Sequence, residues 1–373
     1  MKKAGCIVTV VFAAALGLLL PTGCSTPPPP ASVAGAEFKD SIWGKSQSAA
    51  SIVSQDGGQS FAVPGGTLWT FGDTFLGKRN ADGTPDFQGG GLFSSIAFLP
   101  ESDKSFPPAL RYKTGPDGVA VSPLALLPEE EPGVYLIWPH GGIYAGGKYY
   151  LYYQMIQKTG NGSWDFKGVG SGLAESDTPL GDYRRLCPGD DWHFPVAPAQ
   201  VIEAGDWLYL YEIIGSEGKT GAALARVKGA GIASPAAYEY YSPPEKRFVK
   251  DKSAQGILVP AAGQVSVAYN AYCGGWLMAT SSDLFHPREI TLYLAPAPEG
   301  PWRAIGGITA PETRQGKKVE LVYCAYLHPE LFRDGGKTIA ITFSLYLGEG
   351  NFDANPELVE ATLELTPKKG AAN

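Results

Sequence analysis

Residues 50–77 read Ala50-Ser-Ile-Val-Ser-Gln-Asp-Gly-Gly-Gln-Ser-Phe-Ala-Val-Pro-Gly-Gly-Thr-Leu-Trp-Thr-Phe-Gly-Asp-Thr-Phe-Leu-Gly77. This stretch predicts a short strand, a turn at its Pro-Gly-Gly, and a second strand rich in aromatic and β-branched residues, which are the residues enriched in strands. Similar second strands recur at residues 148–155, 207–214, 275–282 and 337–344. Their preceding strands are expected at residues 135–138, 196–202, 264–269 and 321–327.

The spacing of these strand pairs decides between architectures. The second strands start 81, 59, 68 and 62 residues apart, and no helical pattern of twelve residues occurs outside the first residues of the chain. Short strands at near-regular spacing predict radial repetition of small sheets. Two β-sandwiches are the rival arrangement, but no linker-like stretch divides the middle of the chain. The sequence therefore predicts an all-β, single-domain, five-bladed β-propeller, closed by pairing of a last strand near residues 358–365 with the first blade.

A second repeat supports the first. Residues 178–184 (Thr-Pro-Leu-Gly-Asp-Tyr-Arg) and 297–303 (Ala-Pro-Glu-Gly-Pro-Trp-Arg) share the pattern small-Pro-x-Gly-x-aromatic-Arg. They lie 119 residues apart, about twice the interval between hairpins. The same turn is therefore expected in the second and fourth blades.

Composition excludes two classes of protein. Hydrophobic residues make up 44% of the 373 residues and charged residues 18%, so the chain has ample apolar surface to bury and is not disordered. The formal net charge is −7, and no cluster of Lys and Arg interrupts the chain. A nucleic-acid partner is excluded because it would require a basic surface.

The first residues read as an export signal. Lys2 and Lys3 precede an apolar run at residues 7–20, which ends in Leu20-Pro-Thr-Gly-Cys24 and is too short for a membrane span. This arrangement resembles a bacterial lipoprotein signal, in which the cysteine is lipidated; an ordinary cleaved secretory signal is the alternative. We expect a signal peptide at residues 1–23, a Pro-rich tether at 24–38 and the propeller at 39–373. The protein would be exported and held at the cell envelope, its only membrane contact being a lipid on Cys24.

Cysteine and histidine spacing gives no metal site. Beyond the signal and Cys24 three cysteines remain, and the histidines are scattered singly. A bond between Cys273 and Cys324 is conceivable, but separate buried thiols are expected. No pair has the spacing of a zinc site, so neither a metal nor a cofactor is expected.

Carboxylates at strand ends are the first candidates for chemistry, because the inner strands of a propeller line a central channel. Asp56 follows the first strand of the first hairpin, and Asp73 ends the second. In the register of Asp73, the later units carry Gln154, Glu212, Ser281 and Ser344. Asp56 alone could instead fix a turn, as in the Asp-box of sialidases, and Asp73 could cap a strand end.

The opening hairpin, residues 54–77, resembles that of a largely uncharacterised family of propeller domains that includes bacterial endo-D-arabinanases. Residues 325–331 and 334–344 are similar to the last blade of that family. The resemblance implies glycoside hydrolysis by two carboxyl groups near the axis, with Asp56 and Asp73 as the catalytic pair. Glu212 is the reserve, because related arabinanases take their general acid from a glutamate in the third blade. We expect the wider carboxyl spacing of an inverting enzyme.

Further residues are candidates for binding a substrate. His328 and Glu330, at the end of an inner strand, are expected at the same mouth as Asp73, with His140 nearby. Trp138 lies in a Gly- and Pro-rich segment and could stack on a sugar, and Asn270 is a weaker candidate. Each also has a structural interpretation, as a hydrogen-bonded loop residue or part of the core. The leading function is an exported polysaccharide hydrolase acting on a furanoside such as arabinan; the alternative is a carbohydrate-binding propeller without catalysis.

Overall fold

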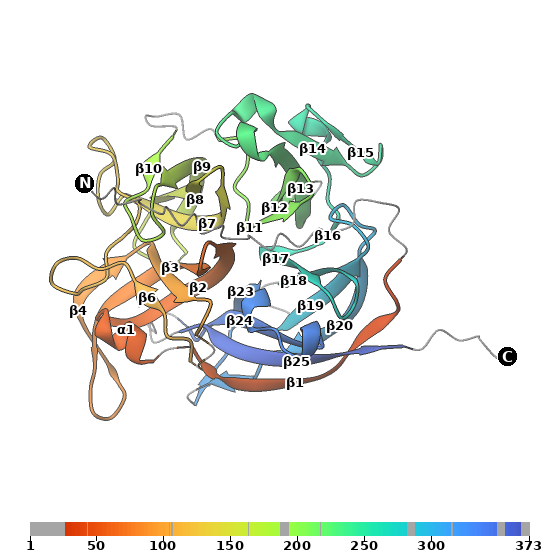
Figure 1. The fold of residues 1–373 in the computed structure, drawn as a ribbon. Coiled ribbons are helices and arrows are strands. Elements are labelled where there is room, and N and C mark those ends of the chain that lie inside the picture. Colours follow the sequence, from red (N-terminus) through yellow and green to blue (C-terminus); the bar gives the residue numbers. More distant parts are fainter. Residues whose placement is uncertain are drawn as a thin grey trace, which may run out of the picture.

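The computed structural model describes residues 27–42, 44–103, 105, 107–162, 164–186, 194–216, 218–281, 288–314, 316–348 and 355–366. Its strands form five antiparallel sheets that surround a common axis (Figure 1). The first strands of the sheets contact one another around that axis. The predicted five-bladed β-propeller is therefore confirmed.

The five blades are numbered I to V in chain order, and their strands run from the axis outward. Blade I contains β2 (Ile52–Val63), β3 (Gly66–Arg79), β5 (Ser95–Pro100) and β6 (Arg111–Tyr112). Strand β4 (Pro85–Leu92) pairs with the C-terminal half of β3. Blade II contains β7 (Tyr135–Ala145), β8 (Lys148–Lys158), β9 (Phe166–Ser176) and β10 (Arg184–Arg185). Blade III contains β11 (Gln200–Ala204), β12 (Trp207–Ser216), β13 (Lys219–Lys228), β14 (Glu239–Ser242), β15 (Arg247–Val249) and β16 (Val259–Pro260).

Blade IV contains β17 (Ala262–Asn270), β18 (Gly275–Ser281), β19 (Glu289–Ala295) and β20 (Arg303–Thr309). Blade V contains β23 (Leu321–Leu327), β24 (Thr338–Tyr346), β25 (Glu357–Leu365) and β1 (Ala31–Ser41). The small elements are α1 (Lys45–Ala49), the β21–β22 hairpin (Thr313–Arg314 and Lys317–Lys318) and five single turns of 3₁₀ helix (Gly229–Gly231, Pro235–Ala237, Lys252–Ala254, Pro329–Leu331 and Asp334–Gly336). None of the helices in the described part of the chain is long and apolar enough to cross a membrane.

The ring is closed by the start of the chain, not by blade I. Strand β1 pairs with β25 along its length, from Ala31 opposite Leu365 to Ser41 opposite Glu357 (Figure 1). The expectation that residues 358–365 pair with the first blade is thus wrong, because β25 lies between β24 and β1. The expected tether also ends earlier, since residues 31–38 are part of β1. Most β1 side chains are exposed, so the strand lacks the apolar alternation by which a sequence reveals one.

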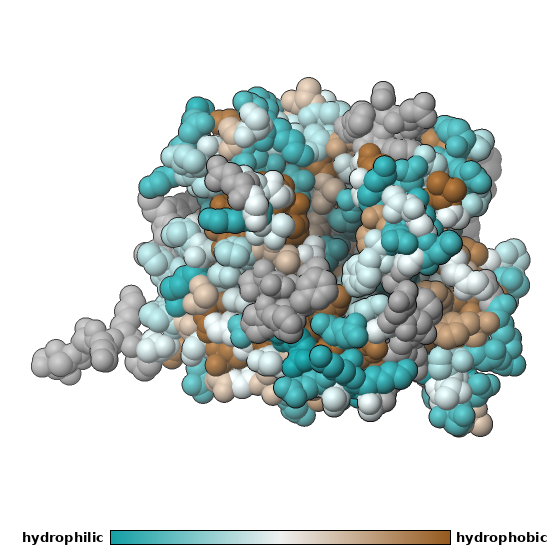
Figure 2. Space-filling model, turned by 180° about the vertical axis from the view of Figure 1, so that it is seen from behind, coloured by the Kyte–Doolittle hydropathy of each residue, from teal (hydrophilic) through white to brown (hydrophobic). Residues whose placement is uncertain are grey.

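The hydrophobic core consists of five separate clusters, one in each interface between neighbouring blades. Blade IV packs on blade V through Leu277, Leu292, Ile339 and Ile341, all of them buried. The face seen in Figure 2 carries hydrophobic residues scattered among hydrophilic ones, and it is hollowed near its middle. Among the described residues, the exposed large hydrophobic side chains are Phe38, Phe87 and Trp164.

Polar side chains tie the inner strands together across the axis. The Gln59 amide of β2 donates to the Ala199 carbonyl and to the Gln200 Oε1, the latter at 3.3 Å. Ser266 of β17 donates to the same Gln200 oxygen at 3.1 Å and accepts from the Leu327 N–H at 3.0 Å. The Gln59, Gln200 and Ser266 side chains are all buried, and each has hydrogen-bond partners within the network. The network thereby joins blades I, III, IV and V.

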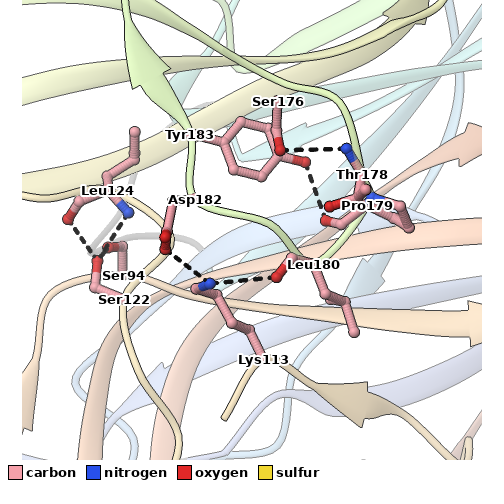
Figure 3. A network of polar contacts seen from close by, with 10 residues as sticks. All are labelled: Ser94, Lys113, Ser122, Leu124, Ser176, Thr178, Pro179, Leu180, Asp182 and Tyr183. Atoms are coloured by element: carbon pink, nitrogen blue, oxygen red, sulfur yellow. Dashed lines mark hydrogen bonds and ion pairs between the residues drawn. The ribbon is translucent and has the colours of Figure 1, made fainter. Parts of the chain in front are cut away.

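The repeated turn fastens one blade to the preceding blade. In blade II, Lys113 of blade I donates to the Leu180 carbonyl at 3.3 Å and pairs with Asp182 at 2.9 Å (Figure 3). In blade IV, Tyr211 of blade III donates to the Pro298 carbonyl at 2.7 Å. The motif found in the sequence is therefore a clamp between blades.

The cysteines of the described region are unpaired. Cys273 and Cys324 are buried free thiols, as expected. Cys24 and the expected signal peptide lie outside the described residues.

Candidate active site

Asp56 and Asp73 lie together at an irregularity in the β2–β3 hairpin. The pairing is regular at Gln55 opposite Thr74 and again at Gly57 opposite Phe71. Between these pairs the single residue Asp56 faces two residues of β3, Gly72 and Asp73. The expectation that the two aspartates lie at strand ends is wrong, because both strands continue past them. Such bulges occur next to active sites, where they re-aim a side chain.

Both carboxylate oxygens of Asp56 accept hydrogen bonds. The backbone N–H of Asp73 donates to Oδ1 at 2.9 Å, and the Tyr323 hydroxyl of blade V donates to Oδ2 at 3.0 Å. A Cβ atom at Gly72 would lie 2.6 Å from Oδ1, so this position requires glycine. The bulge and Tyr323 together fix the Asp56 carboxyl group in place.

Asp73 receives its partner from blade II. The indole N–H of Trp138 donates to Oδ1 of Asp73 at 3.1 Å. The positive charge of Lys158, at the end of β8, also favours the ionised form of Asp73. Trp138 was expected to stack on a sugar; in the structure its N–H holds a carboxylate.

Burial dominates the acidity of both carboxyl groups. Loss of hydration first, and the charge of Asp73 second, raise the pKa of Asp56 to about 8, against the opposing effect of the hydrogen bonds from Tyr323 and the Asp73 N–H. Burial also raises the pKa of Asp73, while Trp138 and Lys158 lower it. Asp56 is therefore the proton-bearing member of the pair, and Asp73 has two groups that favour its charge.

Blade V completes the site with residues that sequence reasoning did not single out for the carboxyl pair. The Ser344 hydroxyl accepts the Gly57 N–H at 3.2 Å, and Tyr323 pairs directly opposite Ser344. Ser344 had been placed in the register of Asp73, but Tyr323 was missed. The position of Tyr323 opposite Ser344 in the hairpin was the signal by which the sequence could have revealed it.

His140 lies on β7 of blade II, and Glu212 lies on β12 of blade III. The start of β7 and the end of β12 point to the same end of the propeller. Burial lowers the pKa of His140 to about 4, with Gln154 and the Ala197 backbone acting in the opposite direction, so the imidazole is neutral at pH 7. Glu212 is buried and accepts from the Ala197 N–H at 3.3 Å. Ala197 thus links the two side chains.

The other contacts of Glu212 lie within blade III. Its Oε1 accepts from Gln255 at 3.0 Å and lies 3.8 Å from the Lys252 ammonium. The bonds that fix Asp56 and Asp73 come instead from Tyr323 and Trp138. The carboxyl pair is therefore built from blades I, II and V, with Glu212 in a separate network.

His328 is a structural residue and not part of the site. It is fully buried, and its ring stacks on Trp69 of blade I at 4.1 Å between centroids. Its two ring nitrogens lie 2.9 Å from the Ser60 hydroxyl and 2.7 Å from the Thr342 hydroxyl. The predicted position at the mouth is wrong, because the imidazole serves as a polar link inside the blade V–blade I interface.

Glu330 and Asn270 lie at the opposite end of the propeller. Glu330 borders a cavity of about 340 Å³ together with Val63 and Gly66, at the β2–β3 turn. Seven residues of strand, roughly 23 Å, separate Asp56 from Val63. Asn270 is buried in the β17–β18 turn, where it donates to the Gly336 carbonyl and accepts the Cys273 N–H, both at 2.8 Å. The expectation that Glu330 lies at the same mouth as Asp73 is therefore wrong, and Asn270 is also not brought to the carboxyl pair.

The chemistry available at the mouth is that of two carboxyl groups of unequal acidity. Among the described residues no three His, Cys, Asp or Glu side chains are placed to hold a metal ion. Asp56 holds a proton at neutral pH, while Trp138 and Lys158 lower the pKa of Asp73 against the larger effect of its burial. Such a pair suits general acid and base catalysis.

Comparisons with solved structures agree with the fold. A candidate hydrolase from Bacteroides ovatus ATCC 8483 is 18% identical, with a TM-score of 0.58 over 83% of this chain and 85% of the other. CoXyl43, a GH43 β-xylosidase/α-arabinofuranosidase from a compost microbial metagenome, is 16% identical, with a TM-score of 0.51 over 89% of this chain and 98% of the other. At these identities the likeness extends to the fold alone.

Sequence comparison gives the family. No curated protein matches the chain. The family model described as "Domain of unknown function (DUF4185)" matches residues 43–348, which span blades I to IV and the first two strands of blade V. The chain therefore belongs to the DUF4185 family.

Proposed function

We propose that this protein is a glycoside hydrolase that cleaves a polysaccharide with Asp56 as general acid and Asp73 as its carboxylate partner. The observation that carries the proposal is the meeting of the two residues at one bulge, where the Asp73 N–H donates to Asp56 Oδ1 at 2.9 Å. The Asp56 carboxyl group has a pKa raised to about 8, and the Asp73 carboxyl group accepts a hydrogen bond from an indole N–H. Two carboxyl groups with separated acidities are what glycosidic bond cleavage requires.

The reaction follows from these roles. Asp56 transfers its proton to the glycosidic oxygen as the bond between that oxygen and the anomeric carbon breaks. Ionised Asp73 removes a proton from a water molecule whose oxygen bonds to the anomeric carbon. Exchange of protons with solvent then returns Asp56 to its acid form and Asp73 to its charged form. This scheme inverts the anomeric centre, and NMR of the first product released would test it.

The substrate class rests on the resemblance of residues 54–77 to the propellers that include endo-D-arabinanases. We propose a furanoside polymer such as arabinan. The sharpest experiment incubates purified residues 27–373 with D-arabinan, L-arabinan, arabinoxylan and galactan, and measures the reducing sugar released. Asp73→Asn is the matched control, because it keeps the shape of the side chain and removes its charge.

The outcomes of that screen separate the two functions. Release of reducing ends from D-arabinan by the wild type, but not by Asp73→Asn, supports the proposal. Binding of a polymer without cleavage by the wild type would favour a carbohydrate-binding propeller. Full activity of both Asp56→Asn and Asp73→Asn would reduce the pair to turn-forming residues and direct attention to Glu212.

We further propose export and lipid anchoring through Cys24, on the strength of Lys2, Lys3, the apolar run and Gly23-Cys24. The protein would then meet its polymer at the cell envelope. Cys24→Ala should move the protein from the membrane fraction to the soluble fraction. A wild-type N-terminus without an acyl chain in mass spectrometry would contradict the anchor.

A further inference from the structure

A row of aromatic rings leads from Asp73 to the surface. Trp138, whose N–H binds Asp73, contacts Phe166 edge-on with 5.0 Å between ring centroids. Phe166 lies 6.3 Å from Trp164, and Trp164 in turn contacts Tyr346 edge-on at 5.4 Å. Every link is a ring contact within the range of favourable aromatic pairs. The four rings therefore form an unbroken series of contacts that begins at the candidate catalytic pair.

This row crosses from one side of the site to the other. Trp164 belongs to the connection between β8 and β9 in blade II, whereas Tyr346 is the last residue of β24 in blade V. Blades II and V are the two neighbours of blade I, which carries Asp56 and Asp73. Tyr346 pairs with Leu321, two residues before the Tyr323 that binds Asp56. The Trp164–Tyr346 contact thus joins the two blades that flank the catalytic pair, at the end of β24 that lies beyond Ser344.

Trp164 is exposed although its neighbours could bury it. Its exposed fraction is 55%, whereas its partner Phe166 is half-buried. Leaving a large aromatic ring in water forgoes hydrophobic stabilisation. Trp164 is also continuous with the rings of Phe166 and Tyr346, and contiguous exposed apolar surface commonly marks a binding site. Tyr346 meets the ring edge-on, so the contacts that hold Trp164 still leave much of it open to solvent.

We propose that Trp164 is a sugar-stacking subsite, at which a sugar unit beyond the cleaved bond lies flat on the indole ring. One face of a sugar ring presents C–H groups, which carry partial positive charge and suit the negative face of an aromatic ring. The inference rests on the proposed function and adds that the substrate is an extended chain.

A binding experiment in an inactive background separates this inference from catalysis. Asp73→Asn is run in native gels that contain soluble D-arabinan or arabinoxylan, with and without Trp164→Ala. We expect Trp164→Ala to weaken retardation about tenfold and Trp164→Phe, which keeps an aromatic face, to restore most of it. Phe38→Ala is the control, since Phe38 is 42% exposed but lies on β1 at the outer edge of blade V. Melting curves confirm that each variant is folded.

The possible results distinguish failure of the subsite from failure of the hydrolase proposal. If Trp164→Ala is retarded to within twofold of its parent variant, the subsite proposal is overturned. It is also overturned if neither polymer retards the parent variant. If Trp164 controls binding but the wild type releases no reducing sugar from any polymer, the subsite stands and the hydrolase proposal fails. If the wild type cleaves a polymer and Trp164→Ala leaves its KM unchanged, the hydrolase stands and the subsite fails.

Discussion

The Asp56 carboxyl group has the most unusual environment of any single side chain in the site. Its native pKa of about 8 exceeds the ordinary value near 3.9, so between pH 4 and pH 8 the folded protein holds a proton that the unfolded chain releases. Stability is therefore lost as the pH rises through this window. The same proton is the one the proposed acid donates, so activity should fall as the pH rises past about 8.

Asp56→Asn tests both statements. The amide cannot ionise, so the variant should be inactive yet gain stability over the wild type as the pH rises from 5 to 8, by more than about 1 kcal/mol at the upper end. Denaturant unfolding at each pH measures the difference, with exposed Asp117→Asn as the control. A difference that is the same at every pH would show that Asp56 is ionised in the folded protein.

Trp138→Phe should change the acid limb of the pH–rate profile. The Trp138 N–H favours the charged form of Asp73, so removing this bond raises the pKa of Asp73. If ionised Asp73 is the base, the limb on the acid side moves to higher pH, by about one unit, while the alkaline limb stays in place. An unmoved acid limb would assign the base role to a different group.

Individual residues of the site differed in how far the sequence could place them. Asp56 and Asp73 could be found, because a local hairpin brings residues 17 positions apart together. Trp138 could be found only as a loop aromatic. Tyr323 comes from a strand 267 residues away from Asp56, and nothing local in the sequence records that contact. His328 was misplaced because a polar residue at a strand end can point into an interface as readily as into a channel.

At the scale of elements, the β2–β3 bulge is the feature that carries the site. The close approach of Asp56 Oδ1 to the Gly72 position leaves no room for a side chain. Gly72→Ala should therefore displace the carboxyl group and cut activity at least a hundredfold, while the blade, held by the rest of the hairpin, stays folded. Steady-state kinetics with circular dichroism checks this. Gly35→Ala in β1 is the control for loss of a strand glycine, because a Cβ there would meet only open space and the backbone is not in the left-handed region.

Element positions followed from the sequence where hydrophobic periodicity is strong. The prediction for residues 321–327 coincides with β23, and both strands of the blade IV hairpin were placed within a few residues. In blade II the second strand was placed as well, but the first, expected at residues 135–138, runs on to Ala145. The bulges escaped prediction, because one extra residue leaves no mark on an aromatic-rich strand. The first strand, β1, escaped because its exposed side chains carry no periodic signal.

For the whole molecule, the decisive question is how much the closing strand β1 contributes. A chain that starts at residue 27 keeps the β1–β25 pairing, whereas one that starts at residue 44 leaves the edge of β25 and part of the blade V core exposed. We expect the shorter chain to melt at least 10 °C lower or to aggregate. Differential scanning calorimetry compares the two, and equal melting temperatures would show that four strands are not needed in blade V.

The position of β1 also sets an order in time. The strand is synthesised first, yet its partner β25 begins at Glu357, more than 300 residues later. At roughly 5–20 residues per second, the ribosome needs on the order of 15–60 seconds to supply it. Throughout that interval the ring is incomplete and its first segment has no partner. Completion of the propeller is therefore a late event, which cannot precede the synthesis of β25.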